Sequence, residues 1–315
     1  MRWPADGVSP RWVALLCCIV LGVLSGCATT HRSAAVGEEL AFVAARGKAV
    51  DLWMMRANGS SLVRLTSMPG TELEPSWSPD GSELVFVSSA ARADPHGRLC
   101  ILTLSTGQLR TVTPTSVNDA AMPTWSPDGK RIAYVREVDA RDQVFTVNAD
   151  GTGNRQITRD AATHDWPSWS PDSKHLAYTR STGSGSSKIW VMTVDGSAAH
   201  SVQPPGVRTA YEEAWSPDGK SIAFVAPVGN PNAQNPVDWN EEVFVMTLDG
   251  MHVHRITHTP GNDHWPPAWS RDSRRLAYTA DGVSGRSWIV VVQADGSRPI
   301  TLRSPGLRAA AFPAW

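Results

Sequence analysis

The sequence has little of three features that often decide the class of a protein. Beyond residue 27 its 315 residues contain one cysteine, Cys100, so no disulfide forms within that part and the fold must rest on its core. The 29 basic and 30 acidic residues form no block of one sign, so nothing indicates a nucleic-acid partner or a polybasic membrane patch. The apolar run Trp12–Leu24 is shorter than a typical membrane-spanning helix.

The beginning of the chain is typical of a targeting segment. Two arginines supply a positive start, the apolar run follows, and small residues come after it. The next residues are small and polar, which suits a flexible tether. We therefore expect a signal peptide over residues 1–26, a tether over residues 27–38 and a folded domain over residues 39–315.

Leu24-Ser25-Gly26-Cys27 resembles the lipobox of bacterial lipoproteins. In that family the signal peptide is cut before the cysteine, which is then acylated. The resemblance implies lipidation at Cys27, and Ala28 after it implies sorting to the outer membrane of a Gram-negative cell, with the protein facing the periplasm. An ordinary signal peptide that happens to contain Cys27 is the alternative.

The rest of the sequence repeats itself. WSPDG begins at Trp77, Trp125 and Trp215, WSPDS at Trp169 and WSRDS at Trp269. A sixth tryptophan, Trp315, follows at a similar distance, and successive tryptophans lie 48, 44, 46, 54 and 46 residues apart. Self-similarity at such a period is the signature of a repeat architecture.

Each repeat unit is expected to contain four short strands. Seven residues after each of the first five tryptophans an apolar segment begins, such as Leu84-Val85-Phe86-Val87. A second segment then ends at a hairpin signal such as Asp150-Gly151, and a third carries a signature such as Val63-Arg64-Leu65-Thr66. A four-stranded sheet cannot bury both faces alone, so the units must stack, and short antiparallel sheets stacked in a ring make a β-propeller.

The ends of the repeat region complete each other. Leu40–Val43 matches the strand that follows a tryptophan turn, but no tryptophan precedes it, whereas Ala310–Trp315 matches the strand before such a turn. We expect the C-terminal strand to pair with the N-terminal strands. The sequence thus predicts an all-β, six-bladed β-propeller of four-stranded antiparallel blades.

The turn itself has a physical explanation. Its proline presets the first corner, its aspartate accepts backbone hydrogen bonds, and its glycine takes a left-handed conformation. The tryptophan before it is expected to wedge between neighbouring sheets.

The pattern of proline, one residue and WSPDG, then an Ile-Ala-Phe-like strand, an Asp-Gly hairpin and Arg-x-Leu-Thr, resembles the repeat of TolB-type propellers. The resemblance covers residues 39–315. It implies a role in the periplasmic Tol-Pal cell-envelope system, in which the family's propeller binds other proteins. TolB also carries an N-terminal α/β domain, for which we expect no room between Cys27 and Leu40, and it is soluble in the periplasm. We therefore expect a TolB-like lipoprotein rather than TolB itself.

The partner is expected on the face opposite the short turns. The variable loops and the mouth of the central channel lie there, and loops on a rigid scaffold are where recognition usually sits. We expect an envelope protein or peptide as the partner, with the lipid as the contact with the membrane, and a monomeric propeller. The residues expected to bind the partner are Glu72, Asp119, His164, Asp165, Tyr211, Glu212, Trp239, Asp263, His264 and Trp265.

Other readings of these residues remain open. His164 and His264 both stand five residues before their tryptophans, but the other units place no histidine there, so no metal or other cofactor is expected. The family resemblance leaves a Ca²⁺ ion in the channel open. Cys100 is expected to be a buried core thiol.

We expect a non-catalytic binding protein. A peptidase of the prolyl oligopeptidase type needs a hydrolase domain with a GxSxG elbow after its propeller, which is not expected here. The alternatives are an enzyme with a site at the propeller centre, such as a metal-dependent sugar lyase, and a propeller that binds a small ligand. Propellers host many functions, so the fold alone does not decide among them.

Overall fold

The computed structural model describes residues 38–46, 49–89, 97–113, 119–183, 186–229, 239–258, 263–282, 286–303, 307 and 309–315. Their strands lie in the compact unit Val36–Trp315. Throughout these ranges the regular structure is β-strand. No helix among them is long and apolar enough to cross a membrane.

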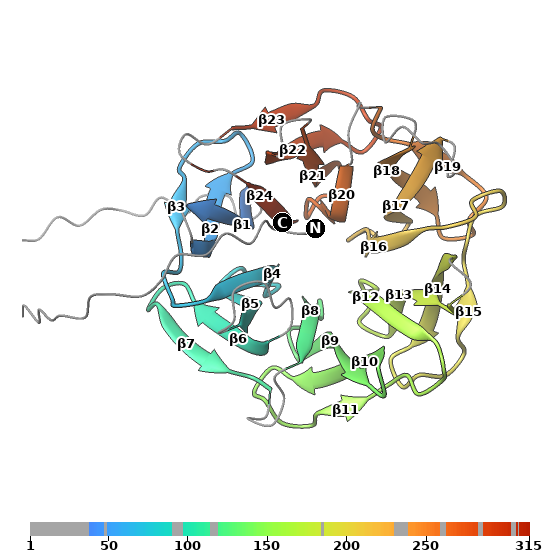
Figure 1. Ribbon diagram of the computed structural model, residues 1–315, viewed down its shortest axis with the longest axis horizontal. Helices are drawn as coiled ribbons and strands as arrows, with labels where there is room; N and C mark the ends of the chain where they lie inside the picture. Colours follow the sequence, from blue (N-terminus) through green and yellow to red (C-terminus); the bar gives the residue numbers. More distant parts are fainter. Residues whose placement is uncertain are drawn as a thin grey trace, which may run out of the picture. The chain divides into compact units, whose positions relative to one another are not determined.

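Four sheets contain four strands each, and all their neighbouring strands are antiparallel. Figure 1 shows the sheets arranged around a central axis, with the first strand of each sheet innermost. The strands are β8 (Ala120–Trp125), β9 (Arg131–Val138), β10 (Arg141–Asn148), β11 (Arg155–Gln156), β12 (Thr163–Trp169), β13 (His175–Ser181), β14 (Ser187–Thr193), β15 (His200–Ser201), β16 (Tyr211–Trp215), β17 (Ser221–Gly229), β18 (Trp239–Thr247), β19 (Val253–Arg255), β20 (Asp263–Trp269), β21 (Arg275–Asp281), β22 (Ser287–Gln293) and β23 (Ile300–Leu302).

A fifth sheet contains eight strands and joins the two ends of the repeat region. Its strands are β24 (Ala310–Ala314), β1 (Glu39–Arg46), β2 (Ala49–Arg56), β3 (Val63–Arg64), β4 (Thr71–Trp77), β5 (Glu83–Ser89), β6 (Arg98–Thr103) and β7 (Gln108–Thr111). The C-terminal β24 pairs with β1 in antiparallel fashion, with Ala314 opposite Ala41, so the predicted pairing of the terminal strands is present. One parallel pair, Val50 with Thr71, links β1–β3 to β4–β7.

The core lies between neighbouring sheets. Ile132 and Tyr134 of β9 are fully buried and belong to one cluster with Leu99 and Ile101 of β6, in the adjacent sheet. Because side chains alternate along a strand, the middle strands bury residues on both faces, which explains their nearly continuous apolar sequence. The stacking predicted from the repeat is thus what buries each sheet.

The threonine of the Arg-x-Leu-Thr signature extends a short outer strand. The outer strands contain two to four residues, so their backbone ladder is brief. The Thr66 hydroxyl accepts the Leu52 backbone N–H at 2.9 Å, and the Thr158 hydroxyl accepts that of Val144 at 2.9 Å. A side-chain oxygen therefore supplies the hydrogen bond that the outer backbone does not reach.

The tryptophan turns have the predicted chemistry. The Ser78 hydroxyl donates to Asp80 Oδ1 at 2.7 Å, the Ser82 N–H donates to the same oxygen at 3.0 Å, and Gly81 has a φ of 73°. The indole rings also bridge neighbouring sheets as predicted. The Trp169 Nε1–H donates to the Thr124 carbonyl at 3.1 Å, and Trp269 makes the same bond to Ala214 at 3.0 Å.

The equal spacing of His164 and His264 from their tryptophans predicts equivalent positions in their sheets, and this prediction is wrong by one residue. His264 pairs with Thr279, and it is Asp165, not His164, that pairs with the corresponding Thr179. The reason is one extra residue in β20, where the pairing skips from His264 to Ala268. His164 and His264 therefore do not occupy equivalent positions.

Cys100 of β6 pairs with Phe86 of β5, as Phe145 of β10 pairs with Tyr134 of β9, so the thiol stands where β10 carries an aromatic residue. It is half-buried, not fully buried as predicted, and burial raises the pKa of its thiol.

Candidate functional site

Two of the predicted binding residues, Glu72 and Asp119, are engaged in separate local contacts. Glu72 of β4 is fully buried and accepts a hydrogen bond from the Thr66 hydroxyl at 3.0 Å. Asp119, just before β8, forms a salt bridge of 2.9 Å with Arg136. Each acidic side chain thus has its own local partner, and burial raises the pKa of Glu72 to about 7.

His164 of β12 is also buried. Its Nε2 lies 3.2 Å from Asp160 Oδ1, and its ring centroid lies 5.5 Å from that of Tyr178. Burial lowers the pKa of the imidazole, and the Asp160 carboxylate partly opposes that shift. His164 therefore serves as a packed core side chain with an acidic partner.

Asp165 belongs to a group of carboxylates where β10, β12 and β16 adjoin. Burial and the neighbouring Asp142 raise the pKa of Asp165 to about 7. Glu213 is 2% exposed and accepts a hydrogen bond from the Thr179 hydroxyl at 2.7 Å, and the same hydroxyl oxygen accepts the Glu212 N–H at 3.2 Å. Burial raises the pKa of Glu213 well above its ordinary value, and Asp165 and Glu212 add to the shift.

Other predicted residues have contacts of their own or lie outside the description. The Tyr211 hydroxyl donates to the Glu241 carboxylate, and burial raises the pKa of the phenol. The backbones of Trp239, Asp263 and His264 lie in strands, at the start of β18 and in β20, but their side chains lie outside the described residues. Cys27 also lies outside them.

The innermost strands contain six bulges. In each innermost strand one non-glycine residue takes a left-handed conformation, with φ between 51° and 70°. A bulge of this kind re-aims a side chain within a strand. The six residues are Glu74, Met122, Trp166, Glu212, Trp265 and Phe312.

Three aromatic side chains from these bulges contact one another. The Trp265 and Phe312 ring centroids lie 4.2 Å apart, and Trp166 lies 6.5 Å from Trp265 and 6.3 Å from Phe312. Because the three rings come from β12, β20 and β24, they meet across the axis. The backbone N–H of Trp166 also donates to the Met122 sulfur, at an N–S distance of 3.4 Å. We call Met122, Trp166, Trp265 and Phe312 the axial plug.

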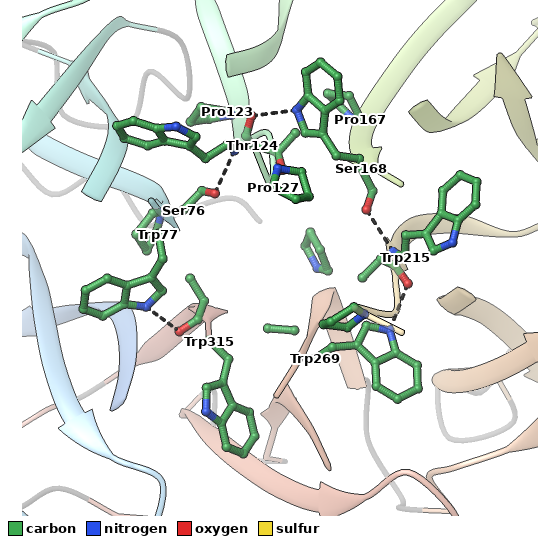
Figure 2. Close-up of a pocket in the computed structure, with 18 of the residues that line it drawn as sticks. Ser76, Trp77, Pro123, Thr124, Pro127, Pro167, Ser168, Trp215, Trp269 and Trp315 are labelled. Atoms are coloured by element: carbon green, nitrogen blue, oxygen red, sulfur yellow. Dashed lines mark hydrogen bonds between the residues drawn. The ribbon is translucent and has the colours of Figure 1, made fainter. Parts of the chain in front are cut away.

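An axial pocket of about 440 Å³ lies on the side of the plug where the tryptophan turns are found. Figure 2 shows the indoles of Trp77, Trp215 and Trp269 directed away from its middle, with Pro127 directed towards it. Its wall repeats proline, a small residue, tryptophan, serine and proline from one sheet to the next, and Met122, Trp166 and Phe312 also line it. The pocket is therefore mainly apolar and proline-rich.

A few charged side chains interrupt this wall. Glu74 is 8% exposed, accepts the Met122 N–H at 2.5 Å, and has a pKa raised to about 7 by burial. Glu213 replaces the first proline of the wall motif. Arg271 replaces the second proline, and its Nη1–H donates to the Pro79 carbonyl at 2.8 Å, across to the turn after β4. The pocket wall thus carries acidic groups and one basic side chain, Arg271, which is already hydrogen-bonded.

Comparisons with known proteins agree with this architecture. The family profile described as TolB beta propeller domain matches residues 93–238. The chain carries TolB-like propeller repeats. The Tol-Pal system protein TolB of Nitratidesulfovibrio vulgaris is 37% identical over 82 residues, 26% of this chain and 17% of that protein. The Protein TolB homolog of Chlorobium luteolum is 40% identical over 103 residues, 33% of this chain and 23% of that protein. The matched segments therefore span less than a quarter of either relative.

Solved structures show the same fold. TolB from Acinetobacter baumannii superposes with a TM-score of 0.75 at 21% identity, over 88% of this chain and 66% of that chain. A putative TolB from Agrobacterium tumefaciens gives 0.66 at 20% identity, over 84% and 88% of the two chains. A chain of the nidogen–laminin complex gives 0.65 at 10% identity, over 88% and 97%. At these identities the likeness concerns the fold.

The axial pocket of this TolB-like propeller was not predicted from the sequence, and none of the predicted residues whose side chains the structure describes is among those that line it. Trp265 is the one predicted residue that belongs to the plug. The sequence did contain one signal for the pocket, in the residue that stands three positions before most of the repeat tryptophans. Glu74, Met122, Trp166 and Phe312 stand at this position, which is the position of the bulge. That column holds large or acidic side chains, but it becomes meaningful only once the bulges point it at the axis.

The described part of the TolB-like propeller offers no metal centre. No three His, Cys, Asp or Glu side chains within it are placed to hold a metal ion. Burial raises the pKa values of Asp165 and Glu213, which favours their protonated forms over the charged forms that bind metal ions. A Ca²⁺ ion at the channel mouth stays a prediction of the family resemblance.

Proposed function

We propose that this protein is a non-catalytic cell-envelope lipoprotein whose TolB-like propeller binds a protein or peptide partner. In this proposal residues 1–26 are a signal peptide, Cys27 carries the lipid, and residues 27–38 tether a monomeric propeller at the outer membrane, facing the periplasm. A curated relative named for the Tol-Pal system supports an envelope role. The lipobox-like residues before Cys27 support the anchor.

The proposed propeller has six blades. The eight-stranded sheet divides into β24-β1-β2-β3 and β4-β5-β6-β7, because only the pair of Val50 with Thr71 joins the two sets. Each set repeats the four-stranded antiparallel pattern of the other sheets. In this count β24 and β1 complete one blade from both ends of the repeat region and close the ring.

The observation that carries the proposal is the contrast between the two ends of the innermost strands. At the turn end, each serine–aspartate turn repeats one hydrogen-bond pattern, as at Ser126 with Asp128 and Ser216 with Asp218. Among the described residues at the opposite end, the contacts vary from sheet to sheet: Asp119 pairs with Arg136, whereas Tyr211 donates to Glu241. Varied chemistry on a uniform rigid scaffold is typical of a recognition surface.

The proposed partner surface rests on its exposed members. Glu72 and His164 are buried and shape the surface from below, whereas Asp119 and Tyr211 are partly exposed. Trp239, at the start of β18, is proposed as an aromatic contact, since buried aromatic anchors often dominate binding energy.

Site-specific photo-crosslinking in intact cells tests this surface. A photoreactive residue at position 239 should capture a discrete protein partner. The same residue at position 251, where Met251 is 69% exposed in a hairpin at the turn end, is the matched control and should capture none. Equal capture at both positions, or none at position 239, would overturn the assignment of the variable end.

The anchor is tested separately. Replacing Cys27 by serine should abolish incorporation of labelled fatty acid and move the protein from the membrane pellet to the soluble periplasmic fraction. If the Cys27→Ser variant is still labelled and pelleted, the lipoprotein part of the proposal is wrong.

A further inference from the structure

The axial pocket lies at the turn end, away from the proposed partner surface, and its chemistry points to a ligand of its own. Its floor combines aromatic rings with a carboxylate. Phe312 and Trp166 line it, with ring planes at 25° and centroids 6.3 Å apart, and Glu74 is also among its lining residues. Aromatic faces and a carboxylate together form the usual surroundings of an organic cation.

Glu74 is placed for this role by its backbone. Its φ of 55° turns the side chain at the bulge, and its neighbours in register, Leu73 and Ser76, remain paired with β5. Among the described residues its carboxylate receives one hydrogen bond, from the Met122 N–H. Burial raises its pKa, and no basic side chain is among the causes of that shift. A cation beside it would supply the charge that the protein does not.

Glu213 is a second and independent pointer. The other five innermost strands have proline two residues before the repeat tryptophan. At the same position β16 has Glu213, whose side chain is 2% exposed. Its Oε2 accepts from Thr179, but its Oε1 has no hydrogen-bond partner within the described structure. A buried carboxylate oxygen without a donor is costly, and it lies on a residue that lines the pocket.

The walls restrict the rest of the ligand. Proline rings from neighbouring sheets line the pocket, so an aliphatic chain is accommodated better than a polar one. Arg271 is the one basic residue among the described lining residues, and its guanidinium donates to the Pro79 carbonyl. It lies in the turn after Trp269, at the opposite end of the wall motif from the bulge residues, so it does not neutralise the floor.

We propose that the axial pocket binds the ammonium group of an aliphatic amine, with the ammonium between Glu74 and the faces of Trp166 and Phe312 and the alkyl chain along the proline wall. The amine is either a free diamine or a lysine side chain presented by a peptide. The site is independent of the partner surface at Trp239, so failure of one proposal does not imply failure of the other.

Isothermal titration of the purified propeller tests the site. The probes are 1,5-diaminopentane, N-acetyl-lysine amide and the neutral 1-pentanol. Saturable binding of at least one amine, with none for the alcohol, is the expected result. Binding of the diamine alone identifies a free amine, and binding of the lysine derivative alone or with it identifies a peptide lysine. Absence of binding by both amines, or equal binding of the alcohol, would overturn the proposal.

Variants locate the binding. Glu74→Gln removes the charge with little change of shape and should weaken amine binding about tenfold, whereas Glu137→Gln, an exposed carboxylate on β9, should leave it unchanged. Phe312→Leu should weaken it about three- to tenfold by removing the aromatic face, and it keeps the test open should Glu74→Gln not fold. Thermal melting followed by circular dichroism checks folding. Wild-type affinity in folded Glu74→Gln or Phe312→Leu would contradict the assigned site.

Discussion

At the scale of the residue, two serines link neighbouring turns. Ser173 and Ser273 stand where the WSPDG turns have glycine, and they adopt left-handed φ angles of 57° and 59°. Each hydroxyl accepts an N–H from the turn of the preceding sheet at 3.0 Å, from Asp128 and from Asp218. The hydrogen bond between sheets offsets the backbone strain that a non-glycine residue carries there.

This balance predicts different effects for two substitutions at one position. Ser173→Ala keeps the strain and loses the hydrogen bond, so the free energy of unfolding should fall by about 1 kcal/mol. Ser173→Gly loses the same bond but relieves the strain, so its unfolding free energy should lie closer to that of the wild type. Urea unfolding of both variants measures this. A glycine variant less stable than the alanine variant would contradict the account.

Glu74 predicts a pH dependence of stability. Burial raises its pKa from an ordinary 4.5 to about 7, so between these values the folded state holds a proton that the unfolded state has lost. Its contribution is therefore fully present below pH 4.5 and is lost as the pH rises through 7, by about 1–3 kcal/mol.

Glu74→Gln should remove this contribution. Over pH 5 to 7 the unfolding free energy should fall less in Glu74→Gln than in the wild type, whereas the exposed control Glu137→Gln should follow the wild type. Urea titrations at several pH values provide the comparison. Parallel curves for Glu74→Gln and wild type would show that Glu74 ionises normally in the folded state.

At the scale of the element, the repeat tryptophans of the innermost strands connect neighbouring sheets. Trp169 and Trp125 are both buried, but only Trp169 donates its indole N–H to the neighbouring sheet, whereas Trp125 Nε1 has no hydrogen-bond partner within the described residues. The repeats are therefore alike in packing but not in hydrogen bonding.

This difference is measurable with matched substitutions. Trp169→Phe should cost about 1 kcal/mol more unfolding free energy than Trp125→Phe, because both lose packing and only the first loses a hydrogen bond. Chemical denaturation of the two variants gives the comparison. Equal losses would mean that the bond from Trp169 to the Thr124 carbonyl contributes nothing.

Local elements were predictable where their cause is local. The WSPDG turn follows from proline, aspartate and glycine at fixed positions, and the pairing of Ala310–Ala314 with the first strand follows from matching the repeats. The bulges were not predictable, because a left-handed Met122 or Phe312 has no sequence signature. The extra residue in β20 then displaced the assignment of His264 by one position.

At the scale of the whole molecule, the pocket arises from assembly and not from any one repeat. Its floor is formed by Glu74, Trp166 and Phe312, which lie in three different innermost strands and are far apart in the sequence. Sequence reasoning placed the site at the variable end because loop variation is visible in the sequence. A cavity between uniform turns is visible only once the sheets are stacked.

The central proposal is that this TolB-like propeller is closed by pairing of its terminal strands, and an engineered disulfide tests it most directly. Ala41 and Ala314 are register partners in β1 and β24, so cysteines at both positions in a Cys100→Ala background should form an intramolecular crosslink. The crosslink should raise the unfolding free energy by about 2–4 kcal/mol. Ala41→Cys combined with Met251→Cys, which are not partners, should form none. No crosslink between positions 41 and 314 in the folded protein would contradict closure.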